Sequence, residues 1–452
     1  MKRLSNTSKW VIALALLTFF SNLPTSGGED VSNARDSALS EYPIDFWGGI
    51  SSVFYSKIPN FPLGWAVHLL IFQVLIITIS LIIIANRFHS KSKRFKLSFL
   101  IFAYLALVFG SHQTRDGLMF GLICLGFSLF YYRSMITTKS LRIWTNFTAI
   151  TLLILAFSFR PWVSFSCSLV LAGWYFVRNK SVKLIYKLSV SVIIFTMFPV
   201  ATVALEIGAQ NLARLHTIHP EQQVISMDLA AAYCWSTNPE TVSAARKALA
   251  LMYLDNNPGN ICESFKPINW VWFSRKPIIE NSDTPTTFAF LTEKNEAQFQ
   301  SLRTQWIKLI FDDPATYVQN KYMYASQVFI AGDSRYIRLL NETYYLKSTR
   351  NNFLDAIFGT FLLPWDLTIS LHLLSMQCVL LFWLILVLKL YRGGSSRSIP
   401  LDSFSVISFL LWLIATVFAY IGDNGRYTYS ASLALLFTLF FENEGSHKRK
   451  IE

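Results

Sequence analysis

The chain has 452 residues, of which 53% are hydrophobic and only 15% are charged, and its mean hydropathy is +0.39. These values exclude an ordinary soluble domain and indicate a membrane protein. The net charge of +13 does not indicate nucleic acid binding, because the Lys and Arg residues fall mainly in short blocks beside apolar runs. That distribution is the positive-inside bias of membrane proteins, so we expect no nucleic acid partner.

Ten apolar runs have a length that suits a transmembrane helix, which needs about 20 residues to cross the hydrocarbon core. We therefore expect an all-α polytopic membrane protein of about ten transmembrane helices, with a large, mostly helical segment on the outer face. The expected helices lie near residues 10–25, 65–86, 97–112, 117–132, 143–159, 162–178, 184–206, 368–390, 402–421 and 428–441.

Basic blocks that flank these runs predict the orientation. The blocks lie at residues 1–9, 86–96, 133–142, 178–183, 389–398 and 447–450. The positive-inside rule puts them in the cytoplasm, so both termini are cytoplasmic in a multi-pass protein of the inner (cytoplasmic) membrane. The first run also fits a cleaved signal peptide, but no clear A-x-A site follows it, and we favour a retained anchor.

This topology divides the chain into three parts. Residues 1–206 form an N-terminal module of seven helices, whose first outer loop covers residues 26–64. Residues 207–367 form the extracytoplasmic segment, and residues 368–452 form a C-terminal module of three helices.

The extracytoplasmic segment carries helical patterns. Residues 239–255 and 293–330 have apolar spacing typical of helices, and Pro314 suits the first turn of a new helix after Asp312 or Asp313. Residues 351–365 are apolar but too short to span, and we expect them in the outer interface.

Two cysteines, Cys234 and Cys262, fall in this extracytoplasmic segment. In an oxidising compartment they are candidates for a disulfide, although two free thiols fit the sequence equally well.

Ionisable residues recur at the outer ends of four hairpins. They are Asp36 and Asp45 in the first loop, Arg115 and Asp116 between the third and fourth helices, Arg160 between the fifth and sixth, and Arg426 between the ninth and tenth. A charge at full membrane depth costs about 2.5 to 3.5 kcal/mol on insertion scales, so such residues are functional candidates.

The sequence has no nucleotide-binding, metalloprotease or serine hydrolase motif and no metal-ligand spacing, although a need for a divalent cation stays open.

The arrangement resembles the GT-C superfamily of multi-pass glycosyltransferases, in particular bacterial members near the protein mannosyltransferase type. Its members have one acidic residue in the first extracytoplasmic loop and a second at the outer end of the hairpin between the third and fourth helices. Here these positions match Asp36 in NARDSALSEYP and Asp116 in TRDGLMFGL, and Arg160 in FRPW follows one hairpin later. The stretches ISMDLAAAY (225–233) and LRTQWIKLIFDDPATYVQNKYMYASQVF (302–329) also look like patterns of that family.

The resemblance implies transfer of a sugar from a polyprenyl-phosphate donor to a glycan, lipid or protein acceptor on the outer face. Asp36 would be the general base, and Asp116 would orient the acceptor or an arginine. The cations that would hold the lipid phosphate are Arg115, Arg160 and Arg426. The sequence departs from the family in having a single Asp36 where relatives carry paired acidic residues or a His-Pro-Pro run. Asp45 therefore stays an alternative base or a substrate-binding carboxylate.

Two rival functions remain. An O-antigen or polysaccharide polymerase or ligase would use the same lipid class, but it relies on arginines in its large outer loops. A lipid-linked solute transporter or flippase is of a different class, and it predicts broken helices near the middle of the membrane. The charges here gather at helix ends on one face, which favours the transferase.

Overall fold

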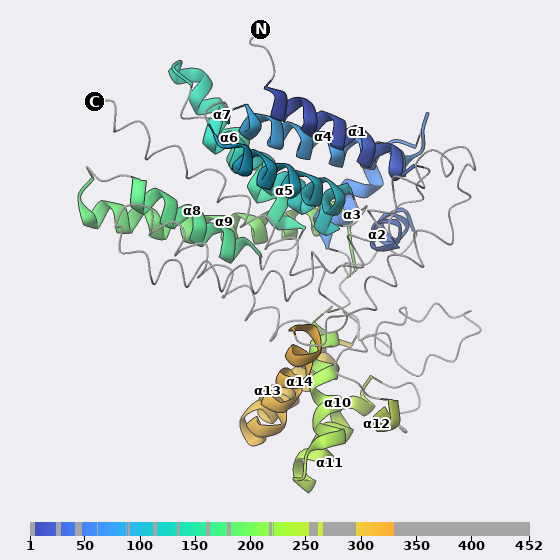
Figure 1. Ribbon diagram of the computed structural model, residues 1–452. Helices are drawn as coiled ribbons and strands as arrows, with labels where there is room; N and C mark the ends of the chain where they lie inside the picture. The colour runs from blue at the N-terminus through green and yellow to red at the C-terminus, as the bar shows by residue number, and fades with distance from the viewer. Residues whose placement is uncertain are drawn as a thin grey trace.

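The computed structural model is all-helical over the residues that it describes (Figure 1). The described residues are 5–23, 29–40, 48–60, 62–86, 88, 91–111, 115–132, 136–159, 163–178, 182–216, 219, 221–252, 261–264 and 295–329. The helices are α1 (Asn6–Ser21), α2 (Glu29–Leu39), α3 (Gly49–Lys57), α4 (Trp65–Ala85), α5 (Lys93–Ser111), α6 (Arg115–Tyr132), α7 (Lys139–Ser158), α8 (Val163–Arg178), α9 (Leu184–Ala213), α10 (Gln222–Trp235), α11 (Pro239–Ala250), α12 (Ile261–Ser264), α13 (Glu296–Asp312) and α14 (Pro314–Phe329).

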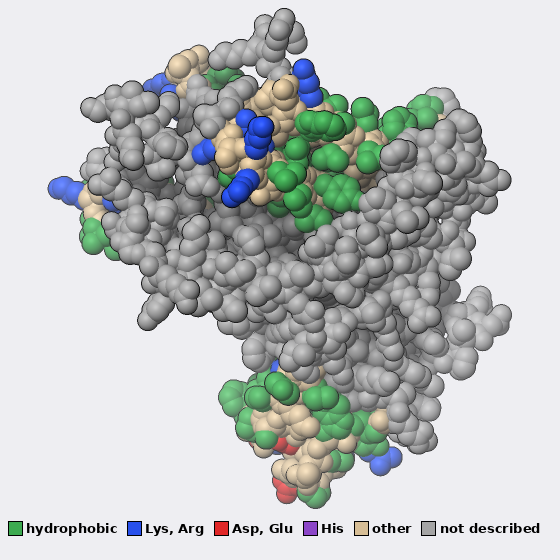
Figure 2. All heavy atoms as spheres, viewed as in Figure 1, with side chains coloured by type: hydrophobic (Ala, Val, Ile, Leu, Met, Phe, Trp, Pro, Cys, Tyr) green, Lys and Arg blue, Asp and Glu red, His purple; other side chains and the backbone are tan. Residues whose placement is uncertain are grey.

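Helices α1 to α9 form one group of packed helices, the upper body in Figure 1. Helix α1 packs on α4 and α5, α6 packs on α4 and α7, and α9 packs on α3, α7 and α8. One hydrophobic core runs through this body, with fully buried side chains such as Leu70, Ile77, Phe120 and Phe157. On the described part of its surface, apolar side chains form a patch, and Lys and Arg side chains lie beside it (Figure 2). An apolar surface of this kind is typical of contact with lipid.

Three of the described helices are long and apolar enough to cross a membrane, namely α4, α7 and α9. Helices α1 and α6 are apolar but shorter. For all seven expected spans in the first 206 residues, the structure has a helix at the predicted position. The expected spans at 368–390, 402–421 and 428–441 and the interfacial stretch at 351–365 lie outside the described residues.

Several helix boundaries differ from those expected from the sequence. Helices α1, α5 and α7 begin four residues earlier, and α1 ends at Ser21 instead of near residue 25. Helix α9 continues past residue 206 to Ala213, where Arg214 takes a left-handed conformation with φ 51° and ends it. Glu206 therefore lies inside α9, where hydrogen bonds from the start of α3 compensate its charge. Residues 26–64, which we expected to form the first outer loop, contain the helices α2 and α3. Apolar runs alone do not reveal these helices because both are short and partly polar.

Small residues bring the helices of the upper body close together. A Cβ atom at Gly126 of α6 would lie 2.7 Å from Cγ of Leu153 in α7. A Cβ atom at Gly121 would lie 2.7 Å from Cδ1 of Ile76 in α4. Glycine at these positions lets backbones approach, as is common between membrane helices.

Helices α10 to α14 form a second body with its own hydrophobic core (Figure 1). Helix α10 contacts α11, α13 and α14, and buries Ile225, Leu229 and Ala230 against them. The helices expected within 239–255 and 293–330 are confirmed as α11, α13 and α14. Pro314 is the first residue of α14, also as expected, because its missing N–H is not needed at that position.

We expect Gly126→Ile to destabilise the α6–α7 contact by about 1 to 3 kcal/mol, because the added side chain has no space beside Leu153. Thermal unfolding of the purified protein in detergent measures the effect. Gly208→Ala in α9 is the matched control, since a Cβ atom there meets nothing within 4 Å and alanine favours a helix. Equal melting temperatures for the Gly126→Ile variant and the control would contradict this account of the packing.

Candidate functional site

The residues predicted to form a site are only partly described. Asp36 lies on α2 with an exposed side chain, and Arg115 is the first residue of α6 with a side chain that is only 8% exposed. Asp116 follows in the first turn of α6, but its side chain lies outside the described part of the structure. Asp45, Arg160 and Arg426 also lie outside it.

Helix α3 is held at its N-terminus by a carboxylate from α9. The Glu206 side chain accepts hydrogen bonds from the backbone N–H of Gly49 and, at 3.1 Å, from that of Ile50. The amide of Gln210, one turn further along α9, donates to the same carboxylate at 3.3 Å. A carboxylate satisfies the free N–H groups of a helix start and interacts favourably with the positive end of its dipole.

The other end of α3 is held by a guanidinium group from α2. Arg35 donates hydrogen bonds to the backbone carbonyl of Tyr55 and, at 3.1 Å, to that of Ile58. Its guanidinium group also lies 5.4 Å from the ring centre of Trp65, at the start of α4. A cation suits the negative end of a helix dipole, so the charges at both ends of α3 have the favourable sign. Asp36 is the next residue after Arg35, so this anchor also positions Asp36.

Two aromatic contacts bring α3 to the end of α7. The rings of Phe54 and Tyr55 lie 5.7 and 6.0 Å from the ring of Phe159. Phe159 directly precedes Arg160, so the chain leads from this contact to one of the predicted phosphate-binding residues.

Polar contacts show which helix ends share one end of the upper body. Ser5 donates to the carbonyl of Ala85, so the start of α1 lies beside the end of α4, and the two helices run antiparallel. At the other end of α1, Asn22 donates to Ser111 at the end of α5. The end of α1, the end of α5 and the start of α4 therefore lie at one end of the body. Asp36 is linked to this end through the contact of Arg35 with Trp65.

A buried polar cluster occupies the second body, and sequence reasoning missed it. The Asp228 carboxylate accepts hydrogen bonds from Trp306 Nε1 at 2.9 Å and Asn320 Nδ2 at 2.7 Å. Lys321 Nζ lies 2.8 Å from the same carboxylate, and both charged side chains are almost fully buried. The only signal in the sequence was an aspartate inside an otherwise apolar helical stretch, ISMDLAAAY.

The charges of this cluster satisfy one another. Lys321 Nζ also lies 5.2 Å from the ring centre of Tyr317. Burial, and then the negative charge of Asp228, raise the pKa of Tyr317 to about 12, so its hydroxyl stays neutral at physiological pH. Because Asp228, Trp306 and Lys321 come from α10, α13 and α14, the cluster joins three helices. The stretches 225–233 and 302–329 therefore contact each other and stabilise this body.

The corner between α13 and α14 has a further carboxylate contact. Asp313 accepts hydrogen bonds from the backbone N–H of Thr316 at 3.1 Å, the Thr316 hydroxyl at 2.9 Å and the Ser236 hydroxyl at 2.5 Å. Burial raises the pKa of the Asp313 carboxyl, but these hydrogen bonds outweigh it and the pKa lies below its ordinary value. Asp313 is therefore charged at neutral pH and caps the start of α14.

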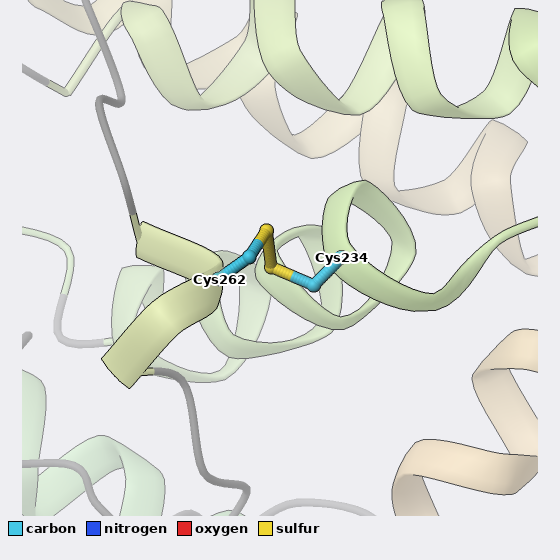
Figure 3. The surroundings of a disulfide bond; sticks show 2 residues. All are labelled: Cys234 and Cys262. Carbon is cyan, nitrogen blue, oxygen red and sulfur yellow. A yellow bond between two sulfur atoms is a disulfide. The ribbon is translucent and has the colours of Figure 1, made fainter.

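A disulfide joins Cys234 at the end of α10 to Cys262 in α12 (Figure 3). The sequence had left this pairing open against two free thiols. Among the described residues, no group of three or more His, Cys, Asp or Glu side chains is placed to hold a metal ion.

Comparison with known proteins yields no match: no family model matches the chain, and no curated protein or solved structure is significantly similar to it.

We expect the protein to lose stability when one partner of the buried ion pair between Asp228 and Lys321 is removed. Asp228→Leu leaves the Lys321 ammonium buried without its counter-ion and should cost about 3 to 5 kcal/mol. The double variant Asp228→Leu/Lys321→Met removes both charges and should be more stable than the single variant. Chemical unfolding monitored by tryptophan fluorescence measures both, and a double variant less stable than the single one would contradict the role of the pair.

Proposed function

We propose that the protein is an integral membrane glycosyltransferase that moves a sugar from a polyprenyl-phosphate donor to an acceptor on the outer face of the cytoplasmic membrane. The observation that carries this proposal is the anchoring of α2, which holds the exposed carboxylate of Asp36 at one end of the helix body. The end of α5 lies at that same end, and α6 begins four residues later with Arg115. A carboxylate and a buried guanidinium from separate hairpins are the two kinds of group that this chemistry needs.

The proposed reaction breaks the bond between the anomeric carbon and the phosphate oxygen of the donor. The acceptor hydroxyl oxygen forms the new bond to that carbon, its proton passes to Asp36, and the bonding electrons leave with the lipid phosphate. Arg115 would stabilise the charge on the departing phosphate, helped by the positive end of α6, at which it stands. Asp116 would orient the acceptor, and Arg160 and Arg426 would complete the phosphate contacts.

The proposed topology keeps ten transmembrane helices and both termini in the cytoplasm. The disulfide supports an outer location for the segment that begins at residue 207, because disulfides persist in oxidising compartments. The packing of α1 against α4 and α5 supports a retained first helix, since its removal would expose the faces of α4 and α5 that α1 covers.

We expect Asp36→Asn to lower sugar transfer by about 100-fold or more, because a general base typically contributes that much. Asp116→Asn should also lower transfer, because the acceptor would lose a group that orients it. The measurement is mass spectrometry of polyprenyl-linked sugars in lipid extracts of cells that carry each variant, where the unused donor should accumulate. Asp312→Asn is the matched control, since that carboxylate is exposed on α13 in the second body. Asp45→Asn decides between the two candidate bases, and full transfer by the Asp36 and Asp116 variants would contradict the assignment.

We expect the Cys234–Cys262 disulfide to face the outside of the cell. In a variant whose three other cysteines, Cys124, Cys167 and Cys378, are replaced by serine, a membrane-impermeant maleimide should label intact cells only after reduction by an impermeant phosphine. Labelling that requires permeabilised membranes would contradict the proposed orientation. The same variant lacking Cys234 and Cys262 controls for background labelling.

A further inference from the structure

Glu206 is a charged residue in a surrounding that does not favour charge. It lies in α9, a helix apolar enough to cross a membrane, and its neighbours Leu205 and Ile207 are exposed apolar side chains. A carboxylate near hydrocarbon is costly unless hydrogen-bond donors compensate it. The structure supplies these donors from the backbone of Gly49 and Ile50 and from the side chain of Gln210.

The contact between α3 and α9 is close enough to depend on glycine at two positions. Gly48 has φ 84°, a left-handed conformation that other residues rarely adopt. A Cβ atom at Gly49 would lie 2.5 Å from the backbone N of Gln210. The backbone of the α3 start therefore lies directly on α9, with the Glu206 carboxylate placed at its first amide groups.

We propose that Glu206 is a positioning residue, which fixes α3 on α9 and through α3 fixes the helix that carries Asp36. The link runs through the other end of α3, where the carbonyls of Tyr55 and Ile58 accept the hydrogen bonds of Arg35. Because Arg35 precedes Asp36 in α2, a loosened α3 also loosens Asp36. The effect on activity rests on the proposed transferase function, whereas the effect on the position of α3 does not.

Among the described residues, the hydrogen bonds of Glu206 join it to Gly49, Ile50 and Gln210, none of which is assigned to the proposed chemistry. Its effect should therefore be one of geometry. Loss of a helix-capping side chain typically shifts the local equilibrium by about tenfold. Glu206→Ala removes both acceptor oxygens, whereas Glu206→Gln keeps one acceptor oxygen for the amide groups of Gly49 and Ile50, which now donate to separate oxygens. Asn211→Ala, at an exposed position of α9 one turn away, is the matched control.

Hydrogen–deuterium exchange of the full-length protein in lipid nanodiscs tests the structural part. We expect about tenfold faster exchange over residues 49–57 in Glu206→Ala and a smaller increase in Glu206→Gln. Exchange over α4 and in the Asn211→Ala variant should not change. Unchanged exchange over residues 49–57 in Glu206→Ala would overturn the proposal whatever the protein catalyses.

Accumulation of polyprenyl-linked sugar in cells tests the functional part with the same three variants. We expect sugar transfer to be highest in the wild type, lower in Glu206→Gln and lowest in Glu206→Ala. The transfer that Glu206→Gln retains should match the protection from exchange that it retains over residues 49–57. Faster exchange with undiminished transfer would overturn the positioning role. If the wild-type protein changes no polyprenyl-linked species, the proposed function fails, and the exchange result alone decides whether Glu206 positions α3.

Discussion

The contact between the Glu206 carboxylate and the first amide groups of α3 is the constraint on which the arrangement of the upper body depends. Without it, α3 would have free N–H groups at its start and α9 would carry an uncompensated charge among apolar side chains. With it, α3 becomes a fixed part of the helix body. At the other end of α3, the hydrogen bonds of Arg35 then fix α2 on α3.

The second body is organised by the same physical principle, with a carboxylate that gathers donors from other helices. Asp228 binds Trp306, Asn320 and Lys321, so three helices meet at one buried charge. Such a cluster adds little net stability compared with apolar packing. It allows few other arrangements of the three helices, because moving one helix would leave a buried charge without its partner. The disulfide fixes α12 to the same helix α10. This body has its own core, whereas the carboxylate that we propose as the base lies in the upper body.

The sequence predicted the helices well where apolar runs are long, as in α4 and α9, and where proline marks a start, as at Pro314. It missed α2 and α3, because a helix of 9 or 11 residues with mixed polarity gives no clear signal. It also missed the hydrogen-bond partners of Glu206 and Asp228. Gly49 is 157 residues from Glu206 in the chain, and Asn320 is 92 residues from Asp228. Spacing in sequence carries no information at such separations. The resemblance to a family pointed to the stretch that contains Asp228 but not to what that residue contacts.

We propose that a polyprenyl phosphate binds at the end of the upper body where α2 is anchored and α6 begins. Photocrosslinking with a diazirine-bearing polyprenyl phosphate, on the full-length protein in nanodiscs, tests it most directly when the labelled peptides are mapped by mass spectrometry. We expect label on peptides from residues 29–64 and 115–132, suppressed by excess undecaprenyl phosphate. Label spread evenly over the apolar helices, and unaffected by the competitor, would contradict the account.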